Sequence, residues 1–230
     1  MNLMSPVFPL AVVAALAAST SIAAQWTHGP PPVVDEAATK LDRLGAEAAL
    51  DVSFVDEHGT PVVLRDFADG SLPIVLNLGY FNCPGMCGFV LNQFLQHLEG
   101  SGLTPGRDFR LLTLSVHHAE GPQLALEKKQ TYVDNLGAPA WTADWPFLTG
   151  DEASIRALTD SVGWRFRFDE FARDVDHPPT LVLLSPTGKV ARYLDARQLT
   201  PSTVRRGIIE AGPLARRRGS GLHEGSGRVR

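Results

Sequence analysis

Residues 73–98, PIVLNLGYFNCPGMCGFVLNQFLQHL, decide the fold of this chain. The first part, up to Tyr80, is an apolar run that predicts a buried strand, and the last part has apolar residues three and four apart, as in a helix. Cys83 and Cys87 stand between these parts and are the only cysteines among the 230 residues. Because a helix begins with unpaired backbone N–H groups, this junction favours thiolates, which bind soft metals and exchange disulfides. We therefore expect the function to depend on this segment.

Three interpretations of the Cys-x3-Cys pair stay open on its spacing alone. Two cysteines in an exported chain commonly form a structural disulfide. A redox-active dithiol is a second interpretation, although dedicated exchangers usually have two residues between their cysteines. A soft-metal site is the third, with Cu(I) as the leading ion because two thiolates and one imidazole suit it. Zinc would need a fourth ligand, which no further cysteine provides.

A histidine-bearing loop precedes a second strand signal far downstream. The segment DVDHPPT, residues 174–180, leads into an apolar run at 181–184. The turn residues 185–188, SPTG, separate this run from another predicted strand at 189–194. Two such strands around a short turn indicate a β-hairpin.

The cysteine segment, the histidine-bearing loop and the hairpin together resemble the Sco/SenC family. Members of this family are thioredoxin-like copper-binding proteins used to assemble the copper A centre of cytochrome c oxidase. The resemblance extends from about Glu47 to Gly212 and includes FVDEHG at 54–59, LLTLSV at 111–116 and FLTGD at 147–151, in the family's order.

The resemblance implies a copper chaperone. Cys83 and Cys87 would be the thiolate ligands of one copper ion, and His177 would supply an imidazole. The receiver would be the copper A subunit of cytochrome c oxidase or another copper-carrying protein, and the chain would be a carrier, not an enzyme. The alternative is a periplasmic thiol-disulfide oxidoreductase that uses Cys83 and Cys87 to keep the copper-ligand cysteines of the oxidase reduced.

The order of strand and helix patterns predicts an α/β, thioredoxin-like fold, with a central mixed sheet flanked by helices and a terminal β-hairpin. The predicted helices cover residues 88–99, 122–136, 151–162 and 201–211, and the predicted strands lie near 52–55, 61–64, 73–80, 109–116, 164–168, 180–184 and 189–194. Because thioredoxin-like folds have a cis-proline opposite the dithiol, we also expect a cis bond before Pro178 or Pro179.

The ends of the chain indicate export. Residues 1–24 combine a short apolar run with small residues, which predicts a signal peptide or a short membrane anchor. A polar tether at 25–46, the copper-binding domain at 47–212 and a disordered basic tail at 213–230 follow. The expected location is the periplasm, or the inner membrane with the domain facing the periplasm.

The composition of the chain limits the kinds of partner that we expect it to bind. The chain is 44% hydrophobic, so one domain of this size can bury a substantial core. Its net charge is −4 and its body has no basic stripe, which argues against nucleic acid. We expect a membrane-proximal monomer.

Overall fold

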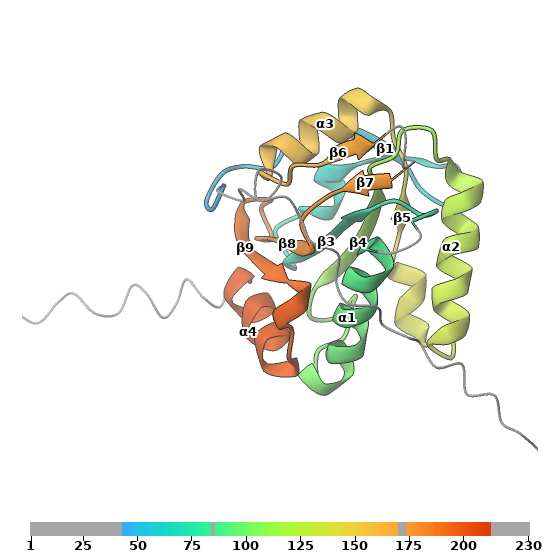
Figure 1. The fold of residues 1–230 in the computed structure, drawn as a ribbon. Helices are drawn as coiled ribbons and strands as arrows, with labels where there is room; N and C mark the ends of the chain where they lie inside the picture. Colours follow the sequence, from blue (N-terminus) through green and yellow to red (C-terminus); the bar gives the residue numbers. More distant parts are fainter. Residues whose placement is uncertain (1–42, 84–85, 170–173, 213–230) are drawn as a thin grey trace, which may run out of the picture.

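The computed structural model describes residues 43–83, 86–169 and 174–212 (Figure 1). The predicted signal peptide, most of the predicted tether and the predicted basic tail lie outside these residues. The strands are β1 (Ser53–Val55), β2 (Pro61–Val63), β3 (Ile74–Gly79), β4 (Arg110–Ser115), β5 (Phe147–Leu148), β6 (Arg167–Asp169), β7 (Asp174–Asp176), β8 (Thr180–Leu184) and β9 (Val190–Asp195). The α-helices are α1 (Met86–Ser101), α2 (Pro122–Asn135), α3 (Glu152–Ser161) and α4 (Pro201–Ala211), and short 3-10 helices cover Leu64–Phe67, Ala140–Asp144 and Ala196–Gln198.

A five-stranded mixed sheet in the order β5-β4-β3-β8-β9 forms the centre of the fold. Strands β3, β4 and β5 are parallel, whereas β8 runs antiparallel to both β3 and β9. Helices cover both faces of the sheet, with α3 on one side and α1 and α4 on the other (Figure 1). The predicted thioredoxin-like α/β fold with a terminal hairpin is therefore confirmed.

The burial of strand β3 explains the continuous apolar run in its sequence. All six of its residues are buried, because helices or loops cover both of its faces. Ile74, Leu76 and Leu78 pack in the core on the α3 side, and Val75 packs in the core on the α1 and α4 side. Asn77 is the exception in this strand, a polar residue that is only 3% exposed.

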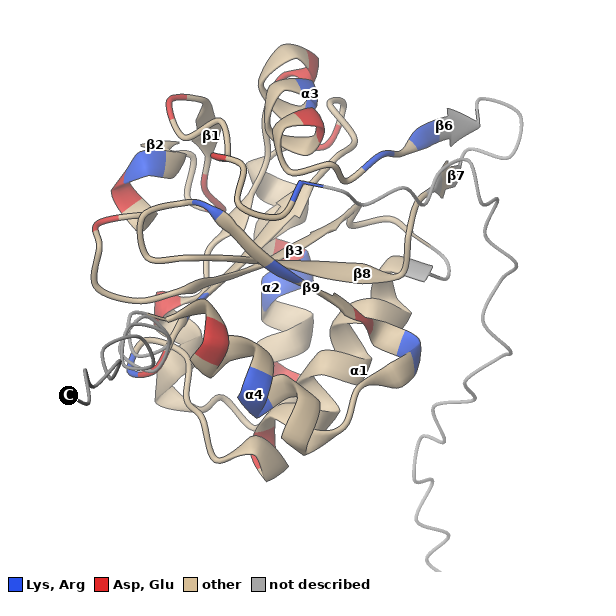
Figure 2. Ribbon diagram, turned by 90° about the vertical axis from the view of Figure 1, so that its left-hand side faces the viewer, with Lys and Arg blue, Asp and Glu red and all other residues tan. Residues whose placement is uncertain are grey.

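The helix predictions agree with the structure to within two residues at each end, and that for α4 agrees at both ends. Three of the four helices begin with a local signal: Asp151 accepts a hydrogen bond from Ser154 N–H ahead of α3, and proline occupies the first turn of both α2 and α4. Charges of both signs are spread over helices and loops in the view of Figure 2.

The strand predicted at 164–168 is wrong in position and in role. The strand begins at Arg167 and pairs with the unpredicted β7 in a two-stranded sheet separate from the central one. Trp164 instead follows α3 in a turn, where its backbone N–H donates to the Thr159 carbonyl. The Trp164 side chain is fully buried and forms part of the hydrophobic core.

The expected cis bond before Pro178 or Pro179 is also wrong, because the described residues contain no cis peptide bond. Among the helices within residues 43–83, 86–169 and 174–212, none combines the length and the apolar character that crossing a membrane requires.

Candidate metal centre

Both cysteines lie where β3 gives way to α1. Cys87 is in the first turn of α1, is 7% exposed, and accepts a hydrogen bond from Tyr80 N–H at 3.4 Å. Strand and helix approach so closely that a Cβ added at Gly79 would lie 2.8 Å from the Cys87 Cβ. The absence of a side chain at Gly79 therefore allows Cys87 to pack against the end of β3.

Cys83 is the more accessible thiol of the pair. It follows a turn in which its N–H donates to the Tyr80 carbonyl at 3.3 Å, and its side chain is half-buried. Its Sγ accepts a hydrogen bond from Cys87 N–H, also at 3.3 Å. The sulfur therefore sits against the electropositive start of α1, as the sequence predicts. The two cysteines are not joined by a disulfide in this structure.

His177 lies between β7 and β8, ninety positions from Cys87 in the sequence, and brings its ring to Cys87. Its Nε2 is 3.1 Å from the Cys87 Sγ, and the residue is only 1% exposed. Its Nδ1 is 3.0 Å from the Pro178 carbonyl oxygen. Because a carbonyl oxygen only accepts hydrogen bonds, Nδ1 carries a proton. In the neutral ring this directs the Nε2 lone pair toward the sulfur, as a metal ligand requires.

Trp164 packs against the His177 imidazole. The two rings stack with centroids 5.1 Å apart and planes 30° apart. The Trp164 indole is itself fixed, because its Nε1 donates to the Thr180 carbonyl at 3.2 Å, at the start of β8. Sequence reasoning assigned Trp164 to a strand and missed this role. Its signal was a large aromatic residue placed before a histidine-bearing loop.

Glu120 holds the loop that leads to Cys83. It lies in the connection between β4 and α2, is 9% exposed, and accepts hydrogen bonds from Phe81 N–H at 2.7 Å and Asn82 N–H at 2.9 Å. A third hydrogen bond comes from the Ser115 hydroxyl at 2.6 Å. Sequence reasoning missed Glu120 as well. The only available signal was an acidic residue just beyond a strand end.

Aromatic packing borders the thiols on the α2 side. Burial raises the pKa of the Tyr132 phenol well above its ordinary value, and negative charge at Cys87 and Cys83 adds to this effect. The phenol is therefore neutral at physiological pH and can donate a hydrogen bond.

The structure thus joins two of the three predicted ligands and places the third beside them. Within the described residues, no three side chains of Cys, His, Asp or Glu are already gathered closely enough to hold a metal ion. Cys87 and His177 are in contact, while Cys83 bonds to the start of the helix. Two thiols and an Nε2-directed imidazole are nonetheless a donor set that suits copper.

The sequence matches the model of the SCO1/SenC family over residues 43–211. The chain belongs to the SCO1/SenC family. No curated protein matches the sequence.

Several solved structures share the fold of this SCO1/SenC protein. A candidate electron transfer protein from Aquifex aeolicus VF5 is 23% identical, with a TM-score of 0.62, and the match covers 80% of this chain and 99% of that one. Arabidopsis thaliana ScoI with copper bound is 18% identical, with a TM-score of 0.56 and coverages of 70% and 94%. BsSco, described with a disulfide switch and as a member of the Sco family of cytochrome c oxidase assembly proteins, is 19% identical, with a TM-score of 0.56 and coverages of 74% and 95%.

Proposed function

We propose that this SCO1/SenC protein is a copper chaperone. It binds one copper ion through Cys83, Cys87 and His177 and delivers it to the copper A site of a terminal oxidase. The observation that carries the proposal is the 3.1 Å contact between His177 Nε2 and Cys87 Sγ, with Nδ1 held by the Pro178 carbonyl. A metal ligand needs this tautomer, and one imidazole beside two thiols completes a donor set that suits copper.

Accessibility supports transfer by ligand exchange. Cys87 and His177 are buried, whereas Cys83 is half-buried on a loop. Copper entering or leaving therefore meets Cys83 first, and the Cys83 Sγ exchanges its hydrogen bond from Cys87 N–H for the metal. The copper-bound ScoI of Arabidopsis thaliana, a structure with the same fold, agrees with this cargo.

Redox state is expected to control loading. Oxidation of Cys83 and Cys87 to a disulfide would remove two of the three ligands, so only the reduced protein would carry copper. The disulfide switch described for BsSco supports this part of the proposal.

The proposal also includes a cellular location and an oligomeric state. The protein acts in the periplasm, or anchored to the inner membrane and facing the periplasm, as a monomer close to its membrane-bound receiver. It is a carrier and catalyses no turnover reaction. The second candidate function, a thiol-disulfide oxidoreductase for the oxidase cysteines, is favoured by the adjacent thiols at a helix start.

One comparison separates the two functions. Copper stoichiometry and affinity are measured on the reduced protein, on His177→Ala and on the control variant His97→Ala, which changes a histidine on α1 that takes no part in the proposed site. The chaperone predicts one copper per chain, lost or strongly weakened only in His177→Ala. If copper is not bound, and dithiol exchange with a model disulfide is equally fast in all three proteins, the oxidoreductase replaces it.

A further inference from the structure

Asn77 is a buried amide in the strand that leads to the cysteines. It is 3% exposed, and its Oδ1 has no hydrogen-bond partner among the described residues. Buried polar atoms in folded proteins are almost always hydrogen-bonded, to protein or to ordered water. An orphaned acceptor in the central strand therefore points to a partner molecule.

A small cavity adjoins this amide, and Cys87 forms part of its wall. It measures about 20 Å³, and its other walls include Gly79, Thr113, Tyr132 and Phe147. This is room for one water molecule and for no larger ligand. A water would therefore reach Cys87 from the core.

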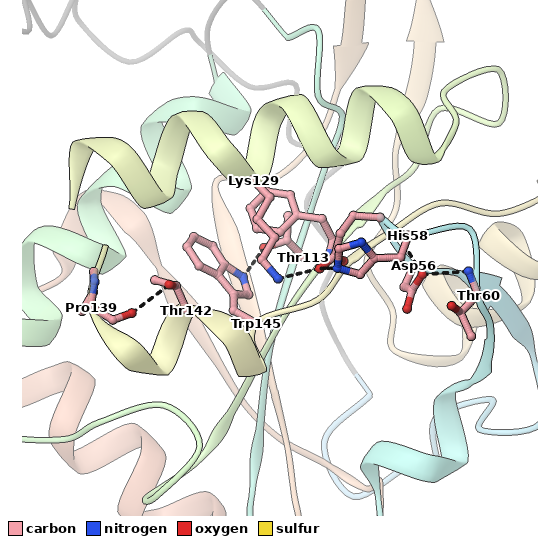
Figure 3. Close-up of polar contacts among 10 residues, drawn as sticks. Asp56, His58, Thr60, Thr113, Lys129, Pro139, Thr142 and Trp145 are labelled. Carbon is pink, nitrogen blue, oxygen red and sulfur yellow. Dashed lines mark hydrogen bonds and ion pairs between the residues drawn. The ribbon is translucent and has the colours of Figure 1, made fainter. Parts of the chain in front are cut away.

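Two hydroxyl groups complete the polar part of the cavity. Thr113 is the register partner of Asn77 on β4, and its Oγ1 accepts a hydrogen bond from Trp145 Nε1 at 3.0 Å (Figure 3). Its own O–H can therefore donate elsewhere. The Tyr132 ring lies beside those of Trp145 and Phe147, with centroids 5.7 and 6.1 Å away. Tyr132 also lines the cavity, so its hydroxyl can donate a hydrogen bond to a water there.

We propose that one buried water molecule occupies this cavity and links Asn77 to Cys87. It donates one hydrogen bond to Asn77 Oδ1 and the other to the Cys87 Sγ. It accepts hydrogen bonds from the hydroxyls of Thr113 and Tyr132. This gives the water four partners, within the range found for buried waters, and satisfies the orphaned amide oxygen.

The water also affects copper, a consequence that rests on the proposed function. A hydrogen bond to a metal-bound thiolate withdraws electron density from the sulfur and thereby raises the reduction potential of copper. The water supplies such a bond from the core and so favours Cu(I), the softer ion. Asn77 is thus a positioning residue for Cys87, acting through the water.

The test compares four proteins, each as the full chain. Asn77→Leu keeps the approximate size of the side chain and removes the acceptor. Tyr132→Phe removes a single hydroxyl and leaves the packed ring, so that it tests the cavity even if Asn77→Leu folds poorly. Asn92→Leu is the matched control, because it removes an amide from α1 at a position that does not line the cavity. The wild-type protein is the fourth.

High-resolution crystal structures of the metal-free proteins decide the occupancy. We expect one water within hydrogen-bond distance of Asn77 Oδ1 and Cys87 Sγ in the wild-type protein and in Asn92→Leu, and none in Asn77→Leu. A dry cavity in the wild-type protein overturns the proposal.

Spectra of the copper-loaded proteins decide the effect on Cys87. We expect the sulfur-to-Cu(II) charge-transfer band to move to longer wavelength and the copper reduction potential to fall in Asn77→Leu, by a smaller amount in Tyr132→Phe, and not in Asn92→Leu. An unchanged band and potential in Asn77→Leu overturn the role assigned to the water. If the wild-type protein binds no copper, the proposed function fails, while the crystal structures still decide whether the water is present.

Discussion

Removing one acceptor from Glu120 tests how firmly the cysteine loop is held. In Glu120→Gln, the remaining amide oxygen can take the place of Oε2, which accepts from Phe81 N–H and the Ser115 hydroxyl. The new amide NH2 then faces Asn82 N–H, which Oε1 accepts in the wild-type protein at 2.9 Å. One hydrogen bond to a charged group is lost and two donors oppose each other. A bond of this kind contributes about 1.5–3 kcal/mol, so we expect the free energy of unfolding to fall by about that amount.

The assay is urea unfolding of the reduced, metal-free protein, followed by copper titration of the same variant. Copper affinity is also expected to fall, because a looser loop presents Cys83 in more conformations. Glu127→Gln on the exposed face of α2 is the matched control and should stay within about 0.5 kcal/mol of the wild type. If Glu120→Gln matched that control in both measurements, Glu120 would not hold the loop.

Three further predictions follow from other contacts. Gly79→Ala should displace Cys87 and weaken copper binding while the protein still folds, because the added Cβ would lie 2.8 Å from the Cys87 Cβ and 3.1 Å from its Sγ. Copper titration measures the affinity, and circular dichroism checks the fold. An unchanged copper affinity would contradict this prediction. Lys129→Met should cost about 3–5 kcal/mol in urea unfolding, because it leaves Glu57, which is 4% exposed and lies 2.5 Å from the Lys129 Nζ, without its cation. The double variant Glu57→Gln/Lys129→Met should cost less than the sum of the single changes, and an additive result would contradict the pairing. Hydrogen bonds from the first turn of α3 hold the pKa of the Asp151 carboxyl below its usual range. The stabilising effect of Asp151 is therefore present at neutral pH and disappears as the pH falls through the folded-state pKa. Melting temperatures of the wild type and Asp151→Ala should differ at pH 7 and converge at acidic pH, and a difference that persisted in acid would refute this.

Much of the fold could be predicted from local patterns. The three-and-four spacing in residues 88–99 and the unbroken apolar run before Tyr80 depend only on neighbouring residues, and both gave the correct element. The prediction at 164–168 failed because apolar and aromatic residues there suit a buried turn as well as a strand. Trp164 is buried by the imidazole and the core, not by strand pairing in the central sheet.

The sequence by itself predicted where the chemistry lies. Two cysteines at a strand-to-helix junction depend on local order alone, and the resemblance to a copper-binding family added His177 as a candidate partner. Copper ligation by these three residues stays a prediction.

Only the tertiary structure decided how these residues meet. Pairing of β3 with β8 brings His177 to Cys87 across ninety positions, the Pro178 carbonyl selects the Nδ1 proton, and packing leaves Asn77 facing a cavity beside the thiol. Contacts of this range arise from strand register and from the filling of the core. Neither leaves a periodic signal in the residues involved, because each contact depends on two segments whose relative position the local sequence does not contain.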